Sequence, residues 1–124
     1  MIEVGAHGSV ELTVSDDDTA VAFRSGTVPV LATPRVVALV EEATVVAVSA
    51  LLAAGETTVG MRVQLDHLAP TPVGALVTAE ATLDKVEGRR LTFNVSVTDG
   101  RGLVAVGKVT RVVVDVQRFL ERAG

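Results

Sequence analysis

Four residues spread along the 124-residue chain supply groups that could act together on a carbonyl compound. Thr33 offers a hydroxyl, Glu41 a carboxylate and His67 an imidazole, while Gly60 could present a free backbone N–H. Acyl transfer needs such a set: a nucleophile or a holder of water, an acid or base with a partner that orients it, and an oxyanion donor. The residue types therefore indicate acyl-transfer chemistry if the fold brings the four together.

Each of the four also has an ordinary structural explanation. Thr33 could cap a helix, Gly60 could mark a β-bulge or a close approach of backbone, and a histidine on an apolar strand face is usually a hydrogen-bonded core residue. Glu41 stands beside Glu42, and neighbouring helical positions lie about 100° apart, so the two cannot share one environment. We expect one of them to face inward; the alternative is a solvent-exposed strip or a contact between subunits.

Other chemistries lack the residues that they need. The chain has no cysteine, which excludes a thiol nucleophile, a zinc–thiolate site and a disulfide framework. Its two histidines are far apart, and no cluster of His, Asp or Glu has the spacing of metal ligands. The net charge is −4 and the Lys and Arg residues are scattered. We therefore expect neither a metal site nor a nucleic-acid partner.

The longest apolar stretch, residues 34–54, is predicted to be a helix and not a membrane span, because two glutamates lie within it. Thr33 as a cap and Pro34 in the first turn mark its start, and Gly55 marks its end. Its apolar residues cover most of the circumference, which is typical of an enclosed helix. We expect no association with a membrane.

Most of the remaining chain has the two-residue period of β-strands. From Val59 to Leu68 the odd positions are apolar, and His67 continues that row, so we expect it to face inward. Further strands are predicted at residues 10–14, 76–86, 91–98 and 103–116. Residues 16–32 have no sustained period and are interpreted as a loop with a short helical piece, suited to act as a lid. Residues 117–122 are expected to form a last helical turn.

Length and composition fit a single domain, residues 1–124, with one core. The chain has 26 valines against three phenylalanines, which favours β-sheet. An antiparallel sheet of about five strands curled around one long helix is an α+β fold. The first residues lack the pattern of a signal peptide, so we expect the cytoplasm.

Several runs of residues resemble those of a known family. They are Thr33 with Glu41 eight residues later, VGMRVQLDH at 59–67, APTPVG at 69–74, VEGRRLTFNVSVTDG at 86–100 and GKVTR at 107–111. In this order and spacing, over about residues 33–114, the chain resembles the fluoroacetyl-CoA thioesterase group of hot-dog thioesterases. The resemblance implies the hot-dog fold, in which a curled sheet wraps one central helix.

The resemblance also implies roles for individual residues. Thr33, Glu41 and His67 match the catalytic threonine, glutamate and histidine of the family, and Gly60 matches the glycine whose N–H helps to hold the thioester oxygen. It further implies coenzyme A thioester substrates, a homodimer or a dimer of dimers, and no metal or redox cofactor. The specialised fluoroacetyl enzyme has aromatic residues in its lid, whereas the matching residues 24–28 here include none.

The spacing of Thr33 and Glu41 raises a geometric problem. Eight helical residues place the Cα atoms of Thr33 and Glu41 about 12 Å apart, beyond the reach of these side chains. Either His67 bridges the two, or the operative threonine and glutamate come from different subunits. The sequence leaves both arrangements open.

We therefore predict a small acyl-CoA thioesterase that releases a free acid and coenzyme A. Arg89 and Arg90 are candidate contacts to the phosphates of coenzyme A, although solvated turn residues are an equal alternative, and Arg111 is expected to pair with an acid. The rival hypothesis is a non-catalytic hot-dog dimer that binds an acyl thioester or another small apolar ligand. A hot-dog dehydratase acting on hydroxyacyl thioesters is a third, disfavoured because no second histidine or aspartate has that family's spacing.

Overall fold

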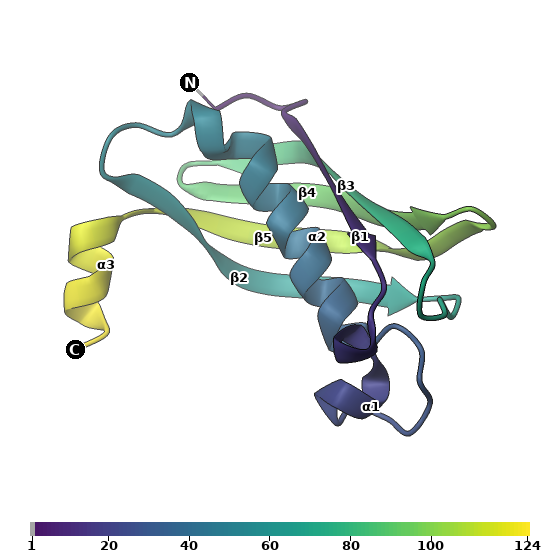
Figure 1. The fold of residues 1–124 in the computed structure, drawn as a ribbon. Helices are drawn as coiled ribbons and strands as arrows, with labels where there is room; N and C mark the ends of the chain where they lie inside the picture. The colour runs from purple at the N-terminus through teal and green to yellow at the C-terminus, as the bar shows by residue number, and fades with distance from the viewer. Residues whose placement is uncertain (1) are drawn as a thin grey trace.

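The long apolar stretch forms a helix, with one strand before it and four after it (Figure 1). The computed structural model describes residues 2–124. The strands are β1 (His7–Thr13), β2 (Glu56–His67), β3 (Leu76–Glu87), β4 (Arg90–Asp99) and β5 (Gly102–Asp115). The helices are α1 (Ala20–Phe23), α2 (Thr33–Val48) and α3 (Val116–Arg122), with 3-10 turns at Asp16–Asp18 and Ser49–Leu51. The order of elements is the one that the sequence predicts.

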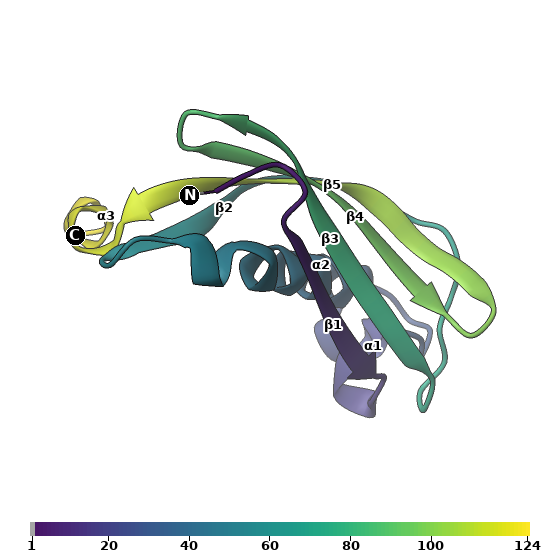
Figure 2. The same ribbon diagram turned by 90° about the horizontal axis from the view of Figure 1, so that it is seen from above.

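The five strands form one antiparallel sheet in the order β1-β3-β4-β5-β2. The sheet curls, and α2 lies along its concave side (Figures 1 and 2). The predicted α+β architecture, with five antiparallel strands around one long helix, is confirmed. Because β1 and β2 are the edge strands, the 12-residue β2 presents an open edge on which another strand could pair.

One face of α2 packs on the sheet and forms the core with it. Val36, Leu39 and Val40 of α2 are buried in one cluster with Phe93 of β4 and Val77 of β3. Each such side chain contributes about 1.5–3 kcal/mol by leaving water. This packing fixes the direction of α2, and therefore the placement of every polar side chain that α2 carries.

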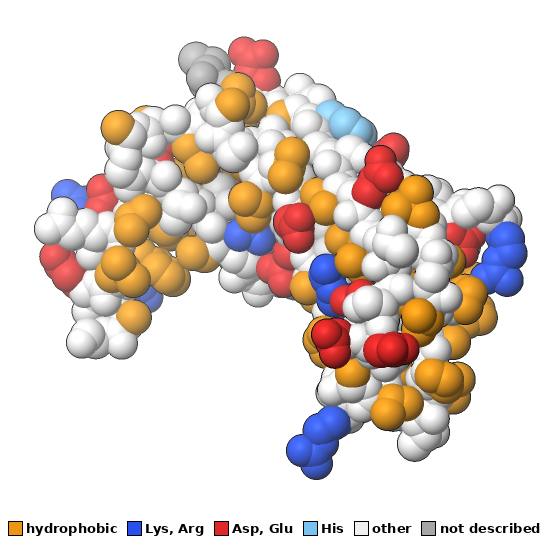
Figure 3. Space-filling view, in the orientation of Figure 1, with side chains coloured by type: hydrophobic (Ala, Val, Ile, Leu, Met, Phe, Trp, Pro, Cys, Tyr) orange, Lys and Arg blue, Asp and Glu red, His pale blue; other side chains and the backbone are white. Residues whose placement is uncertain are grey.

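The expectation of an enclosed helix ending near residue 54 is wrong in two respects. The α-helix ends at Val48 and continues only as the 3-10 turn Ser49–Leu51. One face of α2 is also open, with Val45 43% and Val46 47% exposed, and hydrophobic side chains gather on this side of the molecule (Figure 3). A single helix on the concave side of a sheet can bury only one face against it. Among the described residues, no helix is long and apolar enough to span a membrane.

The continuous apolar row expected along β2 is interrupted by a β-bulge. The pairing of β2 with β5 shifts between Gly60 and Arg62, so Met61 is the extra residue. Before the bulge the even positions face α2, as the buried Thr58 shows; after it Val63 packs against the core instead. Met61 is consequently 51% exposed, contrary to the expected alternation.

Candidate active site

Thr33 and His67 are hydrogen-bonded to each other. Thr33 is the first residue of α2, and the residue in the N-cap position is Ala32, so the expected capping role of Thr33 is wrong. Its hydroxyl Oγ1 instead lies 2.8 Å from Nδ1 of His67, the last residue of β2. The start of the helix and the end of the strand thus hold a hydroxyl and an imidazole together.

The other ring nitrogen of His67 is free. Its Nε2 is buried and has no hydrogen-bond partner among the described residues. Burial lowers the pKa of His67 below its usual value of 6.5, and the polar backbone of Ala69 opposes this only in part. The imidazole is therefore neutral at pH 7, which is the form that can accept a proton.

A pocket of about 320 Å³ opens at this pair. Thr33, His67 and the segment 68–70 form one wall, and residues of the 20–31 segment, among them Val28 and Leu31, form the other. The predicted lid segment therefore borders the Thr33–His67 pair, of which Thr33 is exposed, and α1 is its predicted short helical piece. The pocket is lined by both polar and apolar groups, as a site for a small acyl group requires.

The lid is fastened to α2 by an ion pair that the sequence did not reveal. Arg35 Nε donates to Asp18 Oδ1 at 3.0 Å, and both side chains are largely buried. Ser15 donates to the same carboxylate through its N–H and its hydroxyl, at 2.8 and 2.9 Å. Burial alone raises the pKa of the Asp18 carboxyl, but the hydrogen bonds from Ser15 and Arg35 outweigh it, and the pKa lies below its usual 3.8.

Glu41 belongs to a second polar cluster, nearer the middle of α2. Its Oε2 accepts a hydrogen bond from Nη1 of the buried Arg111 at 3.3 Å, which confirms the expected ion pair of Arg111 with an acid. Gly60 lies against this carboxylate: a Cβ there would collide with Oε2 of Glu41. Both structural interpretations of Gly60, a bulge and a close approach, are therefore confirmed. Glu42 points away and is exposed, so Glu41 is the inward-facing glutamate.

The two clusters are separate within one chain. Thr33 and Glu41 are eight residues apart on α2, about 12 Å, and Gly60 and His67 are seven residues apart on β2, about 23 Å. Within residues 2–124, no hydrogen bond joins Glu41 to His67 or Thr33. His67 therefore does not bridge Thr33 and Glu41 inside a single subunit.

Arg89 and Arg90 lie at the Glu41 end of the sheet and not beside His67. Arg90 pairs with Val112 of β5, and Arg89 donates from Nη1 to the carbonyl of Val113 at 3.3 Å and to Glu56 at 3.4 Å. Arg90 shares a surface pocket of about 230 Å³ with Arg62 and Lys108. Three basic side chains thus line one surface pocket together with the acidic Glu87, and Lys108 Nζ lies 3.8 Å from Oδ2 of Asp84.

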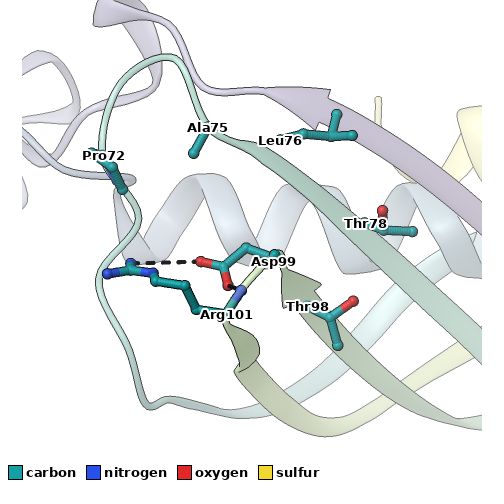
Figure 4. A pocket seen from close by; sticks show the side chains of 8 residues that line it. Pro72, Ala75, Leu76, Thr78, Thr98, Asp99 and Arg101 are labelled. Carbon is teal, nitrogen blue, oxygen red and sulfur yellow. Dashed lines mark hydrogen bonds and ion pairs between the residues drawn. The ribbon is translucent and has the colours of Figure 1, made fainter.

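A larger pocket, of about 630 Å³, lies beyond Pro72 at the ends of β3 and β4 (Figure 4). Its charged side chains, Asp99 and Arg101, point toward each other, with 3.7 Å between Arg101 Nη2 and Asp99 Oδ2. Arg101 also donates to the carbonyl of Pro70 at 2.8 Å, which links this pocket's rim to the segment that follows His67. Because its acid and base are already paired, we assign the chemistry to the Thr33–His67 pocket.

Metal binding finds no support in the described part of the chain, where no three His, Cys, Asp or Glu side chains lie close enough to hold an ion. The groups that are assembled are a hydroxyl, a neutral imidazole, a carboxylate and a bulged backbone. These are the parts of an acyl-transfer site, divided between two places.

Comparison with known proteins agrees with this chemistry. A family model described as fluoroacetyl-CoA-specific thioesterase matches residues 14–117. The fluoroacetyl-CoA thioesterase of Streptantibioticus cattleyicolor is 40% identical over 90 residues, which are 73% of this chain and 65% of that protein. The aligned part is thus just under two thirds of the curated relative.

Solved structures give the same result over nearly the whole chain. A mutant of the fluoroacetyl-CoA-specific thioesterase, in complex with fluoroacetate and CoA, superposes with a TM-score of 0.88 at 32% identity, covering 95% of this chain and 99% of that one. A hot-dog-like protein from Thermanaerovibrio acidaminovorans gives 0.91 at 31% identity, covering 98% and 90%. The fold is therefore the hot-dog fold, and the chain belongs to the fluoroacetyl-CoA-specific thioesterase family.

Proposed function

We propose that the protein is an acyl-CoA thioesterase that hydrolyses a small acyl-CoA to the free acid and coenzyme A. The observation that carries the proposal is the hydrogen bond between Thr33 and His67, with the unpartnered His67 Nε2 buried, at a pocket that the lid segment borders. A hydroxyl beside a neutral imidazole is the arrangement that activates an oxygen nucleophile. Membership of a thioesterase family supports the same reaction.

In the proposed reaction an oxygen nucleophile adds to the thioester carbonyl and the C–S bond breaks. His67 takes the proton from the nucleophile, either the Thr33 hydroxyl or a water held by it, and returns a proton to the leaving thiolate. Where Thr33 itself attacks, a water then hydrolyses the acyl ester. Glu41 either orients His67, activates water or attacks the carbonyl itself; where it attacks, a water then hydrolyses the mixed anhydride and frees the carboxylate. The Gly60 N–H, at a bulge that interrupts the β2–β5 ladder, would hold the carbonyl oxygen, an interaction worth about 3 kcal/mol.

The separation of the two clusters supports a homodimer. In an antiparallel pairing of two β2 edges, the His67 end of one strand lies beside the Gly60 region of the other. In β2, His67 faces Gly60 of the partner when the twofold axis passes between Val63 and Gln64. In α2, Thr33 faces Glu41 of the partner when the same axis passes at Val37. One symmetric contact can therefore complete two sites. The open β2 edge and the exposed apolar face of α2 favour this pairing.

Recognition of coenzyme A is proposed to use the basic side chains at the Glu41 end of the sheet. Arg90, together with Arg62 and Lys108, could contact the phosphates, with Arg89 beside them. Arg90→Ala should raise KM for an acyl-CoA severalfold and leave KM unchanged for the N-acetylcysteamine thioester, which has no phosphates. Arg122→Ala, at the end of α3, is the matched control. An equal change in KM for both substrates would contradict a phosphate contact.

The acyl group is proposed to be small, because the pocket at Thr33 has a volume of only about 320 Å³, at the low end for ligand sites. Phe23 is 41% exposed and does not line that pocket, so aliphatic side chains such as Val28 and Leu31 surround the acyl group. No metal or redox cofactor is needed for this hydrolysis, and coenzyme A enters as part of the substrate. Because acyl-CoA is made and used inside cells, we propose a cytoplasmic location.

A thiol-release assay across short, branched and aromatic acyl-CoAs tests the function. We expect hydrolysis of at least one small acyl-CoA, and a loss of about 10²–10⁴-fold in kcat for His67→Ala and for Glu41→Ala. Glu42→Ala is the control, because Glu42 is the neighbouring glutamate that points into solvent. Silence of the wild type on the whole panel, or full activity of His67→Ala, would contradict the proposal.

A non-catalytic binding protein is the second candidate. One observation favours it: a single chain does not bring Glu41 to the Thr33–His67 pair. It predicts that acyl-CoA raises the melting temperature without any release of thiol. Thermal shift measured beside the thiol-release assay on the same samples separates the two functions.

A further inference from the structure

Arg111 is a buried arginine, 6% exposed, whose contacts connect two parts of the site. Its Nε donates to the Thr58 hydroxyl at 2.9 Å, and its Nη2 donates to the Thr58 carbonyl at 3.0 Å. Its Nη1 donates to Oε2 of Glu41 at 3.3 Å. Thr58 thus supplies two of the three acceptors that hold the guanidinium.

Because the guanidinium of Arg111 is planar, the contacts of one side of the group fix the orientation of the whole group. Its donors form a rigid fork, so holding Nε and Nη2 on one residue fixes the direction of the remaining Nη1–H. Thr58 is itself buried and lies two residues before Gly60 in β2. The β2–β5 ladder pairs Thr58 with Val113. The direction in which Arg111 presents its free donor is therefore set by the sheet and not by α2.

Glu41 on α2 accepts the hydrogen bond from this donor, Nη1 of Arg111. Only its Oε2 is engaged among the described residues, and Gly60 leaves room for that oxygen because it has no Cβ. The carboxylate is about one third exposed, so the Glu41–Arg111 contact and not close packing decides its orientation. The second oxygen, Oε1, accepts no hydrogen bond from the described residues, and its direction follows from that of Oε2.

We infer that Thr58 is a positioning residue: by holding Arg111 with its hydroxyl and carbonyl, it sets the orientation of the Glu41 carboxylate for thioester hydrolysis. The inference rests on the proposed function for its effect on catalysis. Thr58 acts through Arg111 and touches no group that reacts.

Thr58→Val tests this because it keeps the shape of the side chain and removes the hydroxyl acceptor. We expect kcat to fall about tenfold with KM changed less than about twofold, since one charge-assisted hydrogen bond is lost. Thr58→Ser restores the hydroxyl and should bring kcat back to within about twofold of wild type. Thr57→Val, on the neighbouring residue of β2, is the matched control and should behave as wild type.

A double-mutant cycle separates positioning from general loss of structure. In the Glu41→Gln background, Thr58→Val should have no further effect on kcat, because the group that it positions is already gone. An equal fall of kcat in both backgrounds would overturn the inference. So would a wild-type kcat for Thr58→Val.

A measurement that needs no thioester hydrolysis tests the positioning role separately from the proposed function. The carbon-13 NMR signal of the Glu41 carboxyl should shift in Thr58→Val and stay in place in Thr58→Ser and Thr57→Val. An unmoved signal in Thr58→Val would overturn the positioning role whatever the activity. A shifted signal in a protein that hydrolyses no thioester would support the positioning role and contradict the proposed function.

Discussion

The Thr33 hydroxyl lies 2.8 Å from Nδ1 of His67, although 34 residues separate the two in the chain. The contact exists because α2 begins where β2 ends, at one end of the curled sheet. It occupies one ring nitrogen, while Nε2 is buried and has no hydrogen-bond partner among the described residues. The hydrogen bond therefore sets both the orientation of the imidazole and the group that it can activate.

The first prediction concerns pH. Burial lowers the pKa of His67 below 6.5, so the neutral imidazole persists to a lower pH than in an unfolded chain. We expect kcat/KM to fall on the acid side with a midpoint below 6.5. A folded pKa below the unfolded one also means that the contribution of His67 to stability is lost as the pH falls below 6.5. A pH–rate profile of the wild type is the measurement, and an acid limb centred above 6.5 would count against His67 as the base.

The second prediction concerns Thr33. Thr33→Val removes the hydroxyl and keeps the shape, and we expect kcat to fall by about 10²-fold or more. Because Thr33 is not the helix cap, the free energy of unfolding should change by less than about 0.5 kcal/mol. Thr33→Ser, which keeps the hydroxyl, should retain most of the activity. A drop of about 1 kcal/mol in stability for Thr33→Val, as for a lost cap, would show that the hydroxyl has a structural role.

The candidate residues could be selected from the sequence by type and spacing, but their local environments could not be predicted from it. Thr33 before Pro34 has the pattern of a helix cap, yet the helix starts one residue earlier and the hydroxyl bonds to His67. The alternation along β2 predicts Met61 on the buried face, and a single extra residue at the bulge reverses this. A bulge depends on pairing with β5, about 50 residues away, and no local pattern specifies it.

The contacts that the sequence did not reveal have the same origin. Thr58 and Arg111 are 53 residues apart, and Asp18 and Arg35 are 17 residues apart across the lid. An ion pair of Arg111 with some acid could be expected because an arginine in an apolar strand needs a partner. Which acid it meets is decided by the tertiary packing of α2 on the sheet.

The third prediction concerns Gly60. A Cβ at this position would collide with Oε2 of Glu41, so Gly60→Ala must displace the carboxylate. Because the displaced atom is the end of a flexible side chain that is about one third exposed, we expect only a small change in the free energy of unfolding, measured by urea denaturation, together with a large fall in kcat. Gly100→Ala is the control, because a Cβ there meets no atom within 4 Å. Equal behaviour of the two variants would contradict the close approach of Gly60 and Glu41.

The fourth prediction concerns the lid. The pKa of Asp18 is lowered, so its ion pair with Arg35 stabilises the protein above the usual pKa of 3.8 and loses this effect as the pH falls through the lowered pKa. Asp18→Asn should therefore be less stable than wild type at pH 7, and the difference should shrink toward pH 2. Limited proteolysis at pH 7 should cut the variant faster within residues 20–31. Identical cleavage of both proteins would show that the ion pair does not hold the lid.

The central claim, that each site takes Thr33 and His67 from one subunit and Glu41 from the other, is tested by mixing two inactive variants. Homodimers of His67→Ala and of Glu41→Ala each lack one group in every site. After unfolding and refolding together in equal amounts, half of the dimers should be mixed, and each mixed dimer has one complete site. The account predicts recovery of about one quarter of wild-type thioesterase activity. Activity no higher than that of the separate variants, in a sample shown to contain mixed dimers, would contradict it.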